Sequence, residues 1–358
     1  MIMFAPSILL PEGHCRQALV SAGDLFPETD LPSPSDSKDR AYLGLPEGQT
    51  FLLKQVKAEA VLVEILNVYC GHCQQQAEFY NKLFNLMEKD PDTKGRIKIV
   101  GFAAGNDEAE VKDFRETYKV PYPVIPDPRF AVARNLGVTR APFSIYVRQD
   151  PSGKTGVVAA THRGVDSEYA RAFDDLRALT KKSLADVQKK MRPAEEKAAV
   201  VKPVLTGEEL QTRLRAAFMA TGGGIVSMEK VTLKSPREVY MAVFEKQDRF
   251  PRLFAEVISR AVPCDSCHDV HFIYLFDKTG KIIQFEPIQL SKYENEPWDE
   301  SDVAKMRQRL QGKYLFDPFV FDSKVDAVSS ATISSAVIFN SFSDGQTLYQ
   351  ELKEKGLI

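Results

Sequence analysis

Cys70 and Cys73 are spaced so that their thiols could form and break disulfides. They follow an apolar run, residues 60–69, and precede residues 74–87, whose apolar side chains recur with a helical period. We therefore expect Cys70 at the N-terminus of a helix, where unpaired N–H groups and the helix dipole favour a thiolate. Cys73 could then resolve a mixed disulfide at Cys70, and a protonated His72 adds a further cation. The pattern predicts a dithiol catalyst.

Glu64 lies inside the apolar run, six residues before Cys70. A carboxylate is costly there unless it has a function, so we interpret Glu64 as a group of raised pKa that accepts the proton of Cys73. The alternatives are a strand-edge salt bridge for Glu64 and a plain surface position for His72. The cysteine pair itself could be half of a zinc site or a structural disulfide.

These residues resemble the thioredoxin superfamily, in particular its TlpA-like and redoxin-type members. Residues 122–147 resemble the second half of a redoxin-type domain, and Pro142 matches the cis-proline that packs against the active-site disulfide. An Ala-Pro bond that opens an apolar strand is also a plausible cis site on its own terms. The resemblance implies an α/β thioredoxin-like fold and thiol-disulfide oxidoreductase activity on a protein thiol or disulfide substrate.

The composition sets the size and the class of the molecule. With 358 residues, 44% hydrophobic and 27% charged, the chain is long enough for two or three globular domains. A net charge of −2, without a basic stripe interleaved with aromatic residues, argues against a nucleic acid partner. No run of 18 apolar residues occurs, so we expect no transmembrane segment.

Changes in composition along the chain suggest four parts. Residues 1–21 read either as an irregular segment or as the remnant of a signal peptide. Residues 22–181 form the thioredoxin-like domain, residues 182–204 a linker rich in Lys, Glu and Ala, and residues 205–358 a second domain. We expect a periplasmic or extracytoplasmic location and leave a cytoplasmic one open, because C-x-x-C pairs occur in either compartment.

Hydrophobic periodicity and turn residues predict the elements that position these groups. In the first domain they predict strands at 51–56, 60–69, 96–104, 143–147 and 156–162, and helices at 74–87, 107–118 and 166–180. In the second they predict a helix at 208–219, a strand at 237–245, a helix at 253–262, a hairpin of 270–277 with 282–288, and a helix that ends at Phe342.

A second chemical motif opens this last helix. Ser329, Ser330, Thr332 and Ser334 place hydroxyl groups around a helix N-terminus, whose free N–H groups suit a phosphate. An ordinary helix capped by Ser or Thr is the alternative.

Residues 270–342 resemble the FMN-binding domain shared by small subunits of sodium-pumping and Rnf-type quinone and ferredoxin reductases. The resemblance implies an α+β domain in which Thr332 carries FMN through a phosphoester. Ser330 replaces the glycine of the family pattern, so noncovalent FMN binding is kept beside covalent attachment. Four short motifs follow the family's order, at residues 280–281, 294–298, 312–313 and 326–332.

A second cysteine pair, Cys264 and Cys267, precedes the predicted hairpin and is followed by His268 and His271. The sequence allows three interpretations. C-x-x-C-H is the attachment motif of c-type haem, with His268 as the axial ligand. The four side chains could instead bind zinc, or the cysteines could form a reducible disulfide that passes two electrons between a flavin and a thioredoxin-like domain.

Together these patterns predict a two-domain redox protein. The first domain exchanges thiols and disulfides through Cys70 and Cys73, and the second holds FMN and connects this chemistry to an electron donor or acceptor. The alternative is an electron-transfer protein, with flavin and c-type haem, in which the thioredoxin-like domain only docks.

Overall fold

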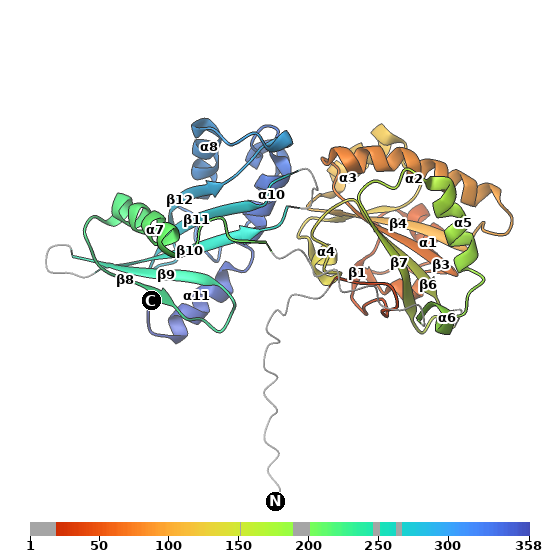
Figure 1. The fold of residues 1–358 in the computed structure, drawn as a ribbon, viewed down its shortest axis with the longest axis horizontal. Coiled ribbons are helices and arrows are strands. Elements are labelled where there is room, and N and C mark those ends of the chain that lie inside the picture. The colour runs from red at the N-terminus through yellow and green to blue at the C-terminus, as the bar shows by residue number, and fades with distance from the viewer. Residues whose placement is uncertain (1–18, 151, 189–200, 246–250, 263–266) are drawn as a thin grey trace, which may run out of the picture.

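The computed structural model describes residues 19–150, 152–188, 201–245, 251–262 and 267–358. These residues form two domains that lie side by side, each with a five-stranded sheet and packed helices (Figure 1). No helix within the described ranges is both long enough and apolar enough to cross a membrane.

The sheet of the first domain consists of β3 (Ala60–Leu66), β4 (Ile97–Ala104), β5 (Val124–Asp127), β6 (Phe143–Gln149) and β7 (Gly156–Arg163). Its strand order is β5-β4-β3-β6-β7. β3 is central, because it pairs in parallel with β4 and antiparallel with β6, and all seven of its residues are buried. A strand that is covered on both faces reads as a continuous apolar run, which accounts for the sequence pattern.

The helices of this domain are α1 (Ser37–Leu43), α2 (Gly71–Lys89), α3 (Glu108–Tyr118), α4 (Ala131–Asn135), α5 (Tyr169–Leu179) and α6 (Leu184–Gln188). α2 follows β3 as predicted and packs against α5 (Figure 1). α3 begins at a capping box of Asp107 and Glu110, which satisfies backbone N–H groups of its first turn. The order of strands and helices is that of a thioredoxin-like α/β fold.

Two expectations for the first domain need correction. The strand predicted at 51–56 is only β2 (Thr50–Phe51), which pairs with β1 (Leu31–Pro32) and is followed by a 3-10 turn, η1 (Leu53–Gln55). The strand ends there because the Gln55 side chain accepts a hydrogen bond from the Leu52 backbone. The expected linker also contains α6, whose Val187 is buried against the domain.

The sheet of the second domain consists of β8 (Ile225–Val231), β9 (Glu238–Phe244), β10 (Arg252–Arg260), β11 (Val270–Asp277) and β12 (Ile282–Gln289). It is an antiparallel meander in which each strand pairs with the next along the chain. The predicted β11–β12 hairpin is confirmed, and its turn is closed by the Gly280 N–H, which donates to the Asp277 carbonyl. Antiparallel strands with packed helices give the α+β architecture that was expected.

The helix predicted at 253–262 is wrong, because this segment is strand β10. Phe254 and Ile258 face one side of the sheet while Ala255 faces the other, which is a period of two. The backbone of β10 is hydrogen-bonded on both sides, by β9 and β11. This pairing outweighs the local helical pattern.

The helices of the second domain are α7 (Gly207–Gly222), α8 (Glu300–Leu310), α9 (Ser323–Asp326), α10 (Thr332–Ser341) and α11 (Gly345–Glu354), with a 3-10 turn η2 (Tyr293–Asn295). α7 covers one face of the sheet through Phe218, which packs near Ile273. The other face holds Phe272 and Tyr274, which contact Phe342 just after α10. The apolar side chains of this second face belong to one contiguous cluster with the core of the first domain.

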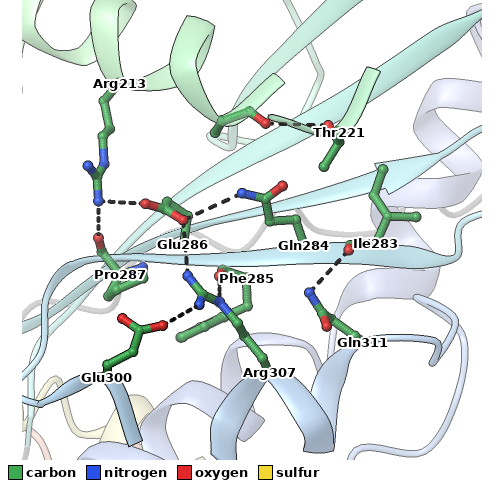
Figure 2. Close-up of polar contacts among 11 residues, drawn as sticks. Arg213, Thr221, Ile283, Gln284, Phe285, Glu286, Pro287, Glu300, Arg307 and Gln311 are labelled. Carbon is green, nitrogen blue, oxygen red and sulfur yellow. Dashed lines mark hydrogen bonds and ion pairs between the residues drawn. The ribbon is translucent and has the colours of Figure 1, made fainter. Parts of the chain in front are cut away.

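Polar contacts attach two helices to the edge strand β12. Figure 2 shows Arg213 of α7 and Arg307 of α8 pointing toward Glu286, at N–O distances of 2.6 and 3.4 Å. Arg213 also donates to the Pro287 carbonyl and Arg307 to the Phe285 carbonyl. The outer strand is therefore covered on its side-chain faces by charged groups, which disfavour pairing with another chain.

A buried ion pair lies within the second sheet. The Arg237 guanidinium is 2.9 Å from the carboxylate of Glu256, which is 1% exposed and also accepts a hydrogen bond from Tyr274. Breaking such a pair leaves a buried charge without compensation.

We predict that Arg237→Met lowers the free energy of unfolding by roughly 3–5 kcal/mol, because the Glu256 carboxylate loses its counter-ion. Lys230→Met is the matched control. Lys230 forms an exposed pair with Glu238 on neighbouring strands, and its loss should cost less than about 1 kcal/mol. Urea unfolding measures both variants. Equal losses in the two variants would contradict the importance of the buried pair.

Candidate functional site

The two predicted catalytic cysteines lie at the start of α2. Cys70 is the N-cap residue and Cys73 lies in the first turn, and both side chains are buried. The Cys73 sulfur accepts a hydrogen bond from the Asn67 N–H at 3.4 Å. Cys70 therefore lies at the positive end of the helix dipole, which favours its thiolate form.

The loop before β6 lies against Cys70. The Ala141–Pro142 peptide bond is cis, as the sequence predicted, and the Cys70 thiol donates to the Ala141 carbonyl at 3.8 Å. Pro142 therefore stands directly after the carbonyl that Cys70 contacts. His72 is exposed in the first turn of α2, and its effect on the redox potential stays a prediction.

Glu64 is a buried carboxyl group in the first domain. It lies on the central strand β3, is 1% exposed, and burial raises its pKa to about 8. Tyr122 donates a hydrogen bond to Glu64 at 3.2 Å and also interacts electrostatically with Cys73. A strand-edge salt bridge does not fit, because β3 is not an edge strand. The sequence analysis did not predict a role for Tyr122. The signal that could have found it is its position directly before the apolar residues 123–125, because a buried tyrosine hydroxyl needs a hydrogen-bond partner.

A cavity of about 280 Å³ lies where the two domains meet. The second domain covers the start of α2 so closely that a Cβ atom at Gly71 would lie 3.4 Å from the Tyr293 hydroxyl. Cys70, the residue before Gly71, is only 1% exposed. The cavity is lined by Tyr69 and Cys70 of the first domain and by Cys267, Lys292, Tyr293 and residues 330–334 of the second.

Three of the four predicted phosphate-binding residues line this cavity. Ser330 and Thr332 lie at the start of α10 together with Ser334, whose hydroxyl donates to the Ser291 carbonyl at 3.1 Å. Ser329 is exposed and does not line it. Ser330 has φ of 58°, a left-handed conformation that favours glycine, which is the residue at this place in the family pattern.

The start of α10 fits a phosphate group. Its N-cap residue, Ala331, provides no side-chain hydrogen bond, so the ordinary Ser/Thr cap is not formed and the first N–H groups are available to a ligand. Lys292 adds a cation, although its ammonium is also 2.8 Å from Asp302. The cavity volume lies slightly below the range of about 300–1,000 Å³ that is usual for small-molecule sites. The fit therefore applies to the phosphate end of FMN and not to the whole cofactor.

The second cysteine pair is described in part. Cys264 lies outside the described residues, whereas Cys267 is half-buried and lines the cavity. The His268 N–H donates to the Asn295 side chain, and His271 is buried on β11 beside the Ser259 hydroxyl. The described ranges contain no cluster of three or more metal-binding side chains. Haem and zinc at this pair stay predictions.

Arg140 joins the two domains beside the cavity, a role that the sequence analysis did not predict. Its guanidinium donates to the carbonyls of Val262 and Cys267 at 3.1 and 3.0 Å. It also forms a 2.8 Å ion pair with Asp269. These partners are more than 120 positions away in the chain, so no local pattern could reveal them.

Comparisons with known proteins found matches to the first domain. Residues 21–178 match the Redoxin family. The N-terminal domain is a redoxin-type domain. Over 104 residues, 29% of this chain, it is 25% identical to thiol-disulfide oxidoreductases ResA of Bacillus thuringiensis subsp. konkukian and Bacillus anthracis. The matched part covers 57% of the length of each relative.

A solved structure is similar to the same region. The thiol:disulfide interchange protein of the thioredoxin family from Chlorobium tepidum is 21% identical, with a TM-score of 0.30. The similarity covers 37% of this chain and 88% of that protein. The Redoxin match ends at residue 178, so the second domain is interpreted from its own residues.

We predict that Glu64→Gln changes how stability depends on pH. Folded Glu64 stays protonated up to about pH 8, whereas in the unfolded chain it ionises near pH 4. In this window the unfolded state binds fewer protons, so the free energy of unfolding falls as pH rises. The variant should lose less stability than wild type between about pH 5 and pH 8, by up to about 1.4 kcal/mol per pH unit.

Urea unfolding at a series of pH values measures this difference. Asp127, whose pKa burial raises to about 7, acts in the same direction but is present in both proteins and cancels. Parallel stability curves for wild type and Glu64→Gln would show that Glu64 does not carry the proposed proton.

Proposed function

We propose that the redoxin-type domain is a thiol-disulfide oxidoreductase that acts on protein disulfides or thiols. The observation that carries this proposal is Cys70 as the N-cap of α2, with Cys73 in the first turn and the cis Ala141–Pro142 bond beside it. The helix N-terminus favours the Cys70 thiolate. The similarity to thiol-disulfide oxidoreductases over this region supports the same chemistry.

The reaction proceeds in two exchanges. The Cys70 thiolate attacks one sulfur of a substrate disulfide, and the other substrate sulfur leaves as a thiolate that takes up a proton. Cys73 then loses its proton and attacks Cys70, which releases the second substrate thiol and leaves a Cys70–Cys73 disulfide. Glu64 exchanges the proton of Cys73, because its pKa of about 8 lets it both accept and donate near neutral pH. The same steps in reverse oxidise a substrate dithiol.

The second domain binds FMN in this proposal, with the phosphate at the start of α10. The N–H groups of the first turn and the hydroxyls of Ser330 and Thr332 would hold the phosphate, and Lys292 would add positive charge. When bound, FMN supplies one- and two-electron transfer. The cavity that these residues line also contains Cys70, which favours redox exchange between the domains over a docking role for the first domain. The electron donor or acceptor and the extracytoplasmic location stay predictions.

We predict that Cys70→Ser lowers disulfide reduction of insulin to the uncatalysed rate, whereas Cys73→Ser accumulates mixed disulfides. The reason is that Cys70 attacks and Cys73 resolves. Turbidity reports the reduction, and nonreducing electrophoresis detects the mixed disulfides. Cys15→Ser is the matched control, because Cys15 belongs to neither C-x-x-C pair. Full turnover in Cys70→Ser would exclude the mechanism.

We predict that the purified chain takes up FMN, and that Thr332→Ala weakens noncovalent binding by about 1–3 kcal/mol through loss of a hydrogen bond to phosphate. Fluorescence titration measures the affinity. Covalent FMN would stay with the denatured chain, and Thr332→Ala would abolish it. Thr347→Ala, on the exposed face of α11, is the control. A chain that takes up no FMN, even with a flavin transferase present, would refute the proposal for the second domain.

A further inference from the structure

Cys70 and Cys267 lie on the wall of the same cavity, although they belong to different domains. The loop of residues 140–142 contacts both segments. Ala141 accepts the hydrogen bond of the Cys70 thiol at 3.8 Å, and Arg140 donates to the Cys267 carbonyl at 3.0 Å. Adjacent residues of one loop therefore hold the two cysteine-bearing segments.

The Arg140 contacts fix the Cys267 segment. One guanidinium binds the carbonyls of Val262 and Cys267, which flank residues 263–266, and the carboxylate of Asp269. Both members of the Arg140–Asp269 pair are mostly shielded from solvent, with side chains 19% and 22% exposed. Charge-assisted hydrogen bonds from a planar guanidinium give orientation as well as affinity. Cys267 is therefore held in place beside the active site.

The second domain also limits what can reach Cys70. Cys70 is only 1% exposed, and Tyr293 of the second domain lies over the start of α2. Attack needs access to the Cys70 sulfur, so a partner sulfur reaches it through the cavity that Cys70 lines. Cys267 of the same chain already lies on the wall of this cavity.

We propose that Cys267 is a direct exchange partner of Cys70, so that the redoxin-type site forms a disulfide with its own second domain. This inference rests on the proposed oxidoreductase function. The site consists of Cys70, Cys73 and Cys267.

The exchange balances as follows. Cys267 loses its proton and attacks the Cys70 sulfur of the Cys70–Cys73 disulfide, that disulfide breaks, and Cys73 departs as a thiolate that takes up a proton. The product is a Cys70–Cys267 disulfide between the two domains. In the reverse step Cys73 attacks Cys70, and Cys267 leaves as a thiolate. No electrons are gained or lost overall, because the disulfide only moves from one pair of sulfurs to the other.

Trapping in the full chain tests this proposal. The variant Cys15→Ser, Cys73→Ser, Cys264→Ser retains only Cys70 and Cys267. Mild oxidation with glutathione disulfide should link these two within one chain, at a rate independent of protein concentration, because the pair is intramolecular. Nonreducing peptide mass spectrometry identifies the link. No link, or a link whose rate rises with protein concentration, would overturn the proposal.

Variants of Arg140 test its positioning role in the same background. Arg140→Ala should slow formation of the Cys70–Cys267 link by about tenfold or more, because charge-assisted hydrogen bonds to the Cys267 segment are lost. Arg140→Lys should recover part of the rate. The rate at which Cys70 reacts with glutathione disulfide should change less than the rate of linking. Unchanged linking in Arg140→Ala would overturn the role assigned to this residue.

The failure of this inference can be told apart from failure of the proposed function. In the Cys267→Ser chain, Cys70 should still react with glutathione disulfide, whereas the disulfide between the two domains should be lost. A Cys70 that reacts with glutathione disulfide but never links to Cys267 would overturn this inference alone. A Cys70→Ser chain that reduces disulfides as well as wild type would overturn the proposed function itself.

Discussion

The arrangement of the two domains depends on the contacts of Arg140 with the chain around Cys267. Arg140 precedes the carbonyl that meets Cys70, so one short loop fixes both the active site and the domain interface. Burial around the guanidinium strengthens these bonds, but it would be costly if the partners were missing. The contiguous apolar cluster across the interface supplies the second part of the attachment. Apolar packing holds the two surfaces together, and the contacts of Arg140 fix their relative position.

Local chemistry explains which parts of the site were predictable from the sequence. Cys70, Cys73, Glu64 and Pro142 follow from short spacings, because helix starts, buried strands and X-Pro bonds depend on near neighbours. β10 was predicted as a helix because its strand character comes from pairing with β9 and β11. The contacts of Arg140 and the proximity of Cys267 to the active site also depend on tertiary structure, which no single segment encodes.

The turn into α10 has a backbone geometry that is costly for a residue with a side chain. Ser330 adopts a left-handed conformation, which glycine would adopt more easily. Lys292 is shared between the cavity and the carboxylates of Asp299 and Asp302, which lowers its net attraction for an anion. The N–H groups of α10 therefore carry much of the electrostatic attraction at this end of the cavity.

The burial of Cys70 affects how readily its thiol is oxidised by small molecules in the solvent. Oxidation of a cysteine by peroxide follows its thiolate character and its exposure, and Cys70 combines a helix N-terminus with only 1% exposure. We therefore expect peroxide in the solvent to oxidise Cys70 more slowly than it would oxidise an exposed thiolate. Burial in the interface thus protects a reactive thiolate from oxidation to sulfenic acid and keeps it available for thiol-disulfide exchange.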